Sequence, residues 1–128
     1  MSEEFIYARL TGTPAVTALV NHRVYPNAAP TGSPRPYVVY NRITTLRVRS
    51  TKGRSGLASP RYQIDAWADS AASAKQVLNE CILSLDGYIG TLANVRVSGV
   101  ITDDQSSDQD AETGLYRHRA DFIIWHYE

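Results

Sequence analysis

The stretch from Pro60 to Gly87 constrains the fold most, because it joins a strand pattern to a helix pattern. In residues 61–66 polar and apolar side chains alternate, which is typical of a strand with one buried face. The next apolar side chains recur with the 3.6-residue period of a helix. They are Ala74, Val77, Leu78, Cys81, Ile82 and Leu85. Asp69 or Ser70 can cap this helix, and Gly87 suits the left-handed position after its end. We therefore expect a strand and a helix that bury each other's apolar surface.

Two short helices are predicted within residues 3–20. Apolar side chains near Phe5 and Leu10 give the first helix a buried face, and Gly12 interrupts it. Thr13 is a candidate cap for the second helix, and Pro14 suits its first position because the missing N–H has no partner there.

The first pair of strands is predicted at residues 37–48 and 60–68. Residues 37–48 are rich in Tyr, Val, Ile and Thr, which favour strands. Residues 47–59 are basic and contain glycines, so they predict a flexible basic hairpin. Upstream, residues 24–26 predict a short extended piece, and the prolines of residues 26–36 predict a loop.

The second pair of strands is predicted after the central helix. Residues 88–93 are interpreted as a connection, and residues 95–102 alternate as a strand does. Residues 103–113 are acidic and nearly devoid of apolar side chains, which predicts a loop that is mobile or held by a partner. Residues 115–127 alternate again and predict the last strand.

These elements predict one domain over residues 1–128, in the order α-β-β-α-β-β. Two antiparallel hairpins followed by helices favour an α+β fold of two layers. We expect an antiparallel four-stranded sheet with the helices packed on one face.

Charge is segregated along this chain of zero net charge. Between residues 35 and 61 all charged side chains are basic, namely Arg35, Arg42, Arg47, Arg49, Lys52, Arg54 and Arg61. Between residues 103 and 112 all are acidic, namely Asp103, Asp104, Asp108, Asp110 and Glu112. Either these are two solvated loops, or the two segments meet within a chain or between copies. Complementary patches of this kind set register and association rate.

The polar face of the predicted sheet is a second candidate interface. Alternation places mainly charged and aromatic side chains on it, namely Asp65, Trp67, Arg117, Arg119, Asp121, Ile123 and Trp125. Tryptophan and arginine are enriched at the centres of protein interfaces. We therefore predict an oligomer contact there. From the basic set, Arg42, Arg47, Arg49, Lys52, Arg54 and Arg61 join this candidate interface, together with the five acidic residues.

The sequence offers no pattern typical of an enzyme. His22, His118 and His126 form none of the spacings of zinc sites, and Cys81 has no partner for a disulfide or a metal. No G-x-S-x-G turn or phosphate-binding glycine loop is present, so we expect no catalytic residue and no cofactor. There is no apolar run of 18 residues, so we expect no membrane partner.

Nucleic acid is the alternative partner that the residues allow. The basic hairpin at residues 42–54 can follow phosphates without reading bases. It lacks interleaved aromatics, so a sequence-specific or stacking mode is not predicted. The chain could then be an accessory module that binds DNA non-specifically.

Several motifs in order resemble a known family. They are RVYPNAAP, PRPYVVYNRI and RYQIDAWADSAASAKQVLNECILSLDG, between Pro14 and Gly87. This set resembles the tail-completion proteins of long-tailed bacteriophages, also called tail terminators or tail-to-head joining proteins. The acidic stretch at residues 103–112 has no clear counterpart in the resemblance.

The resemblance implies a structural protein of the virion, assembled in the host cytoplasm. It implies a homo-oligomeric ring, typically a hexamer, that caps the head-proximal end of the tail tube. The implied partners are the tail tube protein and the head connector or neck protein, with non-specific contact to DNA that passes through the lumen. The family brings no catalytic residue to this chain.

Overall fold

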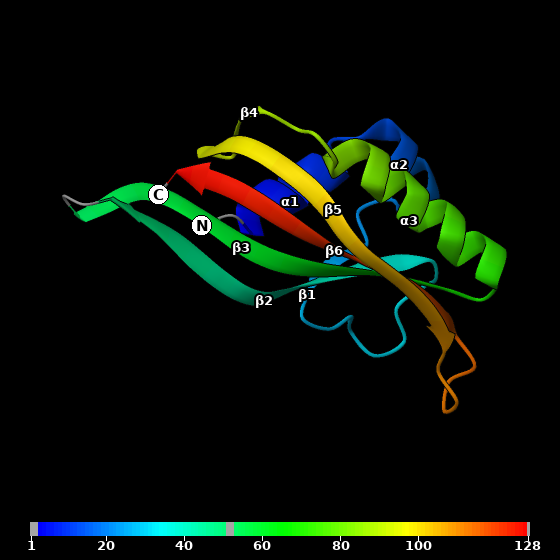
Figure 1. Cartoon of the computed structure of the whole chain (residues 1–128). Helices are drawn as coiled ribbons and strands as arrows, with labels where there is room; N and C mark the ends of the chain where they lie inside the picture. The colour runs from blue at the N-terminus through cyan, green and yellow to red at the C-terminus, as the bar shows by residue number, and fades with distance from the viewer. Residues whose placement is uncertain (1–2, 51–52, 128) are drawn as a thin grey trace.

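The computed structural model describes residues 3–50 and 53–127, with side chains at 3–45 and 56–127. Within these residues the chain forms two helices, three strands, a third helix and three more strands (Figure 1). The helices are α1 (Glu3–Thr11), α2 (Pro14–Val20) and α3 (Ala71–Leu85). The strands are β1 (Val24–Pro26), β2 (Tyr37–Ser50), β3 (Gly53–Ala68), β4 (Gly90–Leu92), β5 (Val95–Gln109) and β6 (Tyr116–Tyr127).

The sheet is mixed and six-stranded, in the order β1-β2-β3-β6-β5-β4. The predicted antiparallel four-stranded, two-layer sheet is therefore wrong. β1 lies parallel to β2, and β4 comes from residues that the sequence predicted as a connection. Each of these edge strands has three residues, too few to show an alternating pattern. The four long strands curl strongly across the molecule (Figure 1).

All three helices lie against one face of this curled sheet (Figure 1). The predicted stripe of α3 is confirmed, since Ala74, Val77, Leu78, Cys81 and Leu85 are buried. They pack in one core with the apolar faces of the strands, including Tyr62, Ile64, Phe122 and Ile124. Burial of each large apolar side chain contributes about 1.5–3 kcal/mol. The central strand and helix thus bury each other, as predicted.

The ends of α3 follow the predicted chemistry. Ser70 Oγ accepts a hydrogen bond of 3.1 Å from the backbone N–H of Ser73, which makes Ser70 the cap. Gly87 has φ of +75°, and its N–H donates to the carbonyl of Val100. The break between α1 and α2 is also confirmed, but Thr13 does not cap α2 with its side chain. Its hydroxyl instead donates to the carbonyl of Arg9 and bonds Ser84 Oγ, at 2.7 Å each.

Both long hairpins extend further as strands than the sequence predicted. β3 begins at Gly53, so residues 53–59 of the predicted flexible hairpin belong to a strand. β5 continues to Gln109, so residues 103–109 of the predicted acidic loop are paired with β6. Only 110–115 form the connecting turn. Hydrogen bonds to a neighbouring strand hold these polar segments in an extended conformation. Such pairing does not require alternating apolar residues, so no such pattern marks these strands in the sequence.

Candidate interface on the open face of the sheet

The face of the sheet away from the helices, here called the open face, carries rows of polar and aromatic residues. Register across β2, β3, β6 and β5 aligns them strand by strand. The first row is Tyr37, Trp67, Arg117 and Asp108. The second is Val39, Asp65, Arg119 and Ser106, and the third is Asn41, Gln63, Asp121 and Asp104. Most of the predicted polar-face residues thus come together on one surface.

Arg117 is the centre of the first row. Its Nε donates to Asp108 Oδ1 at 3.0 Å, and its guanidinium lies 5.1 Å from the centre of the Trp67 ring. The hydrogen bond from Arg117 lowers the pKa of Asp108 and raises that of Arg117 itself. Arg119 reaches the same acid at 3.9 Å and donates to Ser106 Oγ at 3.0 Å. These contacts tie the acidic part of β5 to β6.

Asp65 is a buried carboxylate on this face, with 5% of its surface exposed. Gln63 Nε2 donates to its Oδ1 at 3.0 Å, and Arg117 Nη1 lies 3.9 Å from its Oδ2. Burial raises the pKa of Asp65, although the Gln63 hydrogen bond and the two arginines act in the opposite direction. The charged form of Asp65 is therefore incompletely compensated within the chain.

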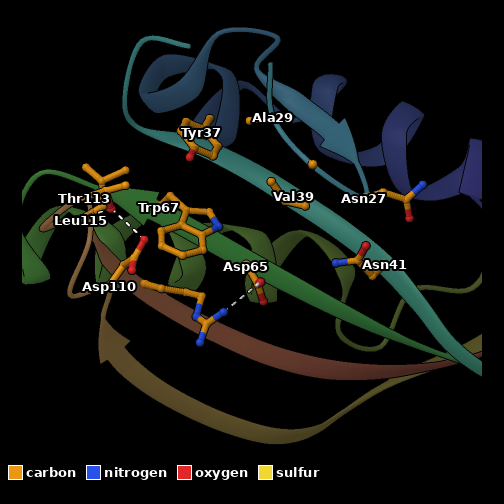
Figure 2. Close-up of a pocket in the computed structure, with 12 residues that line it drawn as sticks. Asn27, Ala29, Tyr37, Val39, Asn41, Asp65, Trp67, Asp110, Thr113 and Leu115 are labelled. Carbon is orange, nitrogen blue, oxygen red and sulfur yellow. Dashed lines mark hydrogen bonds and ion pairs between the residues drawn. The ribbon is translucent and has the colours of Figure 1, made fainter. Parts of the chain in front are cut away.

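A groove of about 410 Å³ opens above Asp65. Figure 2 shows its floor formed by Val39, Asp65 and Trp67, with Tyr37 at one end. The loop after β1 lines one side through residues 27–29, and the 110–115 turn lines another. The groove thus combines the half-buried rings of Tyr37 and Trp67 with the buried carboxylate of Asp65.

Among the side chains that the structure describes, the basic and acidic segments meet at one ion pair. Arg61 bonds the carboxylate of Asp103, and its Nε lies 3.7 Å from Asp121. Arg61 belongs to β3, whereas β3 and β6 separate β2 from β5, so the arginines of β2 lie across the sheet from the acids of β5. The alternative that the segments meet is thus confirmed for this one pair.

The other predicted interface residues are more widely spread. Arg42 lies 3.8 Å from Glu3 of α1, and half-buried Trp125 pairs with Gly99 on the sheet. Asp110 accepts from Thr113 Oγ1 at 2.9 Å inside the turn, where Glu112 is exposed. Arg47, Arg49 and Arg54 belong to the β2–β3 hairpin, at positions where only the backbone is described. Lys52 lies outside the described residues.

Sequence reasoning missed the groove because its lining comes from distant segments. Tyr37, Val39, Asn41 and Gln63 were not predicted as site residues. Tyr37 and Val39 share the rows of Trp67 and Asp65, and Asn41 and Gln63 belong to the next row. Their alternation along β2 is a weak signal, since Val38, Val39 and Tyr40 are all buried. Only the register with β3 shows which of them face the groove.

The described residues hold no group of three or more metal-ligating side chains. No helix among them is long and apolar enough to cross a membrane. The cited ion pairs of the open face join Arg61 with Asp121 and Arg117 with Asp65 and Asp108, so they connect neighbouring strands of the sheet.

The sequence profile described as "Tail completion protein gp17" matches residues 4–127. The chain belongs to this family. The family predicted from the motifs is therefore confirmed, and it assigns the chain a structural role in a phage tail and a place in the virion. The match also includes the acidic part of β5, for which the motifs offered no counterpart.

Solved structures share the fold. A chain from the virion of a native gene transfer agent particle matches with a TM-score of 0.80 at 21% identity, over 96% of this chain and 92% of that one. A second solved chain, whose designation gives no function, matches with a TM-score of 0.56 at 13% identity, over 100% and 99%. No curated protein sequence matches. At these identities the structural matches show the fold alone.

Proposed function

We propose that this tail completion protein forms a homo-oligomeric ring, typically a hexamer, at the head-proximal end of the tail. The ring caps the tail tube, stops its growth and offers the docking surface for the head connector. The observation that carries this proposal is the family match across residues 4–127. Assembly takes place in the host cytoplasm, and DNA passes through the lumen of the ring.

The distribution of charge supports self-assembly. The β2–β3 hairpin, which carries Arg47, Arg49 and Arg54, projects from one end of the molecule (Figure 1). The β5–β6 turn, which carries Asp110 and Glu112, lies at the opposite end (Figure 1). A ring needs a heterologous contact in which one patch meets a different patch of the next copy. A neutral chain with separated charges supplies such patches.

Electron microscopy of tails tests the proposed function. Disruption of the gene should give particles whose tube length is no longer controlled and whose heads and tails stay apart. Purified protein added to such tails should appear as a ring with an open lumen at one end of the tube. Normal head-tail joining without the gene would contradict the proposal.

Non-specific contact with DNA is the alternative role of the basic hairpin at residues 42–54. In the ring this contact would be made with DNA in transit. A purified monomer whose DNA affinity falls steeply with salt, combined with normal tails after gene disruption, would favour the accessory module instead.

A further inference from the structure

The lining of the groove above Asp65, together with the ion pairs that the lining forms, carries more acid than base. Asp65, Asp110 and Arg117 are the charged residues of the lining. Arg117 bonds Asp108, and Arg119 lies 3.9 Å from that same acid. Among these described side chains three carboxylates accompany two guanidinium groups. The groove therefore attracts a cationic group.

The carboxylate of Asp65 has capacity for a further hydrogen-bond donor. Gln63 Nε2 donates to Oδ1 at 3.0 Å and, over the longer distance of 3.4 Å, to Oδ2. Arg117 Nη1 lies 3.9 Å from Oδ2, which is beyond hydrogen-bond range. A carboxylate accepts about four hydrogen bonds. Tyr37 and Trp67 line the same groove (Figure 2) and offer the aromatic surface on which guanidinium groups stack.

The far end of the β2–β3 hairpin extends beyond the rest of the sheet. Within the described residues, the pairing of β3 with β6 ends at Leu57, whereas β2 and β3 stay paired as far as Ser50 and Gly53. Residues 48–50 and 53–56 therefore form a two-stranded ribbon, here called the arm, that projects from one end of the molecule (Figure 1). Two-stranded ribbons are marginally stable by themselves. The arm thus gains stability from a surface to lie against.

Two arginines are register partners in the arm. Arg49 of β2 pairs with Arg54 of β3. Like charges directly opposite each other destabilise a strand pair, and a nearby anion relieves the repulsion. The sequence from Arg35 to Gln63 contains no acidic residue. The anion that suits this pair therefore comes from another part of the fold or from another chain.

The arm does not reach the groove of its own chain. Val39 in the groove and Arg49 in the arm are ten positions apart along β2, on the order of 30 Å at about 3.3 Å per residue. The 110–115 turn, which lines the groove, lies at the end of the molecule opposite the arm (Figure 1). The arm of one copy and the groove of another are thus two different patches, which is the kind of contact that closes a ring.

We propose that the arm of one copy docks in the groove of the next copy, where Arg49 and Arg54 contact the carboxylates of Asp65 and Asp110. This inference rests on the proposed ring and specifies its contact. The incoming arginines balance the excess negative charge of the groove, and the acids relieve the repulsion within the arm. Docking also covers the aromatic surface of the groove.

Photo-crosslinking in rings on tail tubes tests the contact. Ala28→Cys places a thiol on the exposed rim of the groove, where a benzophenone maleimide is attached. The native Cys81 stays unlabelled, because it is fully buried and burial raises the pKa of its thiol to about 12. In rings assembled from a mixture of isotope-labelled and unlabelled chains, mass spectrometry should find the groove of one chain joined to the arm of another.

A matched probe separates docking from random collision. Gln76→Cys carries the same benzophenone on the exposed surface of α3 and should give no crosslink to the arm. If the groove probe joined other segments of the neighbour, or another tail protein, and never the arm, that result would overturn the docking and leave the proposed function intact. Tube ends that carry no copy of this protein would overturn the proposed function itself, and the docking with it.

Charge variants give a second readout, the protein concentration at which half of the tube ends carry a ring. Asp65→Asn keeps the size of the side chain and should raise this concentration about tenfold or more. Arg49→Gln combined with Arg54→Gln should do the same. Asp104→Asn removes an exposed acid outside the groove and should leave the concentration unchanged. Thermal melts show that each variant is folded, and ring formation by folded Asp65→Asn at the native concentration would overturn the proposal.

Discussion

At the scale of single residues, Asp65 makes the clearest prediction about pH. Burial raises the pKa of this carboxyl above its ordinary value of 3.8, so folding favours its protonated form. Its stabilising contribution is therefore complete below that value and is lost as the pH rises through the folded pKa. Asp65→Asn should raise the melting temperature at neutral pH and lose this advantage in acid, which thermal melts across pH would measure. The exposed substitution Asp104→Asn is the control. If Asp65→Asn raised the melting temperature equally at every pH, that result would contradict a raised pKa of Asp65.

Arg117 predicts the opposite dependence on pH. Its hydrogen bond lowers the pKa of Asp108, so this pair stabilises the fold above the ordinary carboxyl pKa and loses its effect as the pH falls through the folded value. Arg117→Ala should cost about 1 kcal/mol near neutral pH, since an exposed ion pair and a guanidinium–indole contact are both lost. Urea unfolding at two pH values measures the difference. Arg96→Ala is the control, because the contact described for Arg96 is a comparable one with the Tyr127 ring. If this variant lost free energy of unfolding with the same pH dependence, that result would argue against the role of Asp108.

At the scale of elements, the start of α3 depends on one hydroxyl. Ser70→Ala removes the acceptor for the N–H of Ser73 and should lower the free energy of unfolding by about 1 kcal/mol. Ser70→Asp keeps an acceptor and should retain the stability. Urea unfolding of the two variants checks this, and equal losses in both would show that the cap does not matter.

The elements also show where the sequence was sufficient. α3 was predictable from the sequence, because an apolar stripe and an N-cap are properties of one short segment. The part of β5 beyond Thr102 was not predicted as a strand, because its order depends on pairing with β6 and on the ion pairs that its acids form with Arg61 and Arg117 of other strands. The candidate site divides in the same way. Alternation placed Asp65, Trp67 and Arg117 on one face, whereas the groove also needed residues 27–29 and the 110–115 turn.

At the scale of the whole molecule, the segregated charge predicts that assembly depends on salt. Screening shortens the range of attraction between the basic segment at residues 35–61 and the acidic segment at residues 103–112, so rings should form more slowly and less completely at high ionic strength. Sedimentation at low and high salt measures the change. Arg42→Glu should weaken assembly at low salt, and assembly that ignores both salt and this reversal would contradict a charge-guided contact.

The sequence by itself determined the family, the two N-terminal helices, the central strand and helix, and the segregation of charge. These features can be predicted from periodicity, caps, motif order and residue type, all of which are properties of the chain itself over short stretches. Only the tertiary structure decided the six-stranded order, the short strands β1 and β4 and the rows of the open face. Register and sheet order depend on which distant strands share hydrogen bonds, and a single strand's pattern does not encode its neighbour.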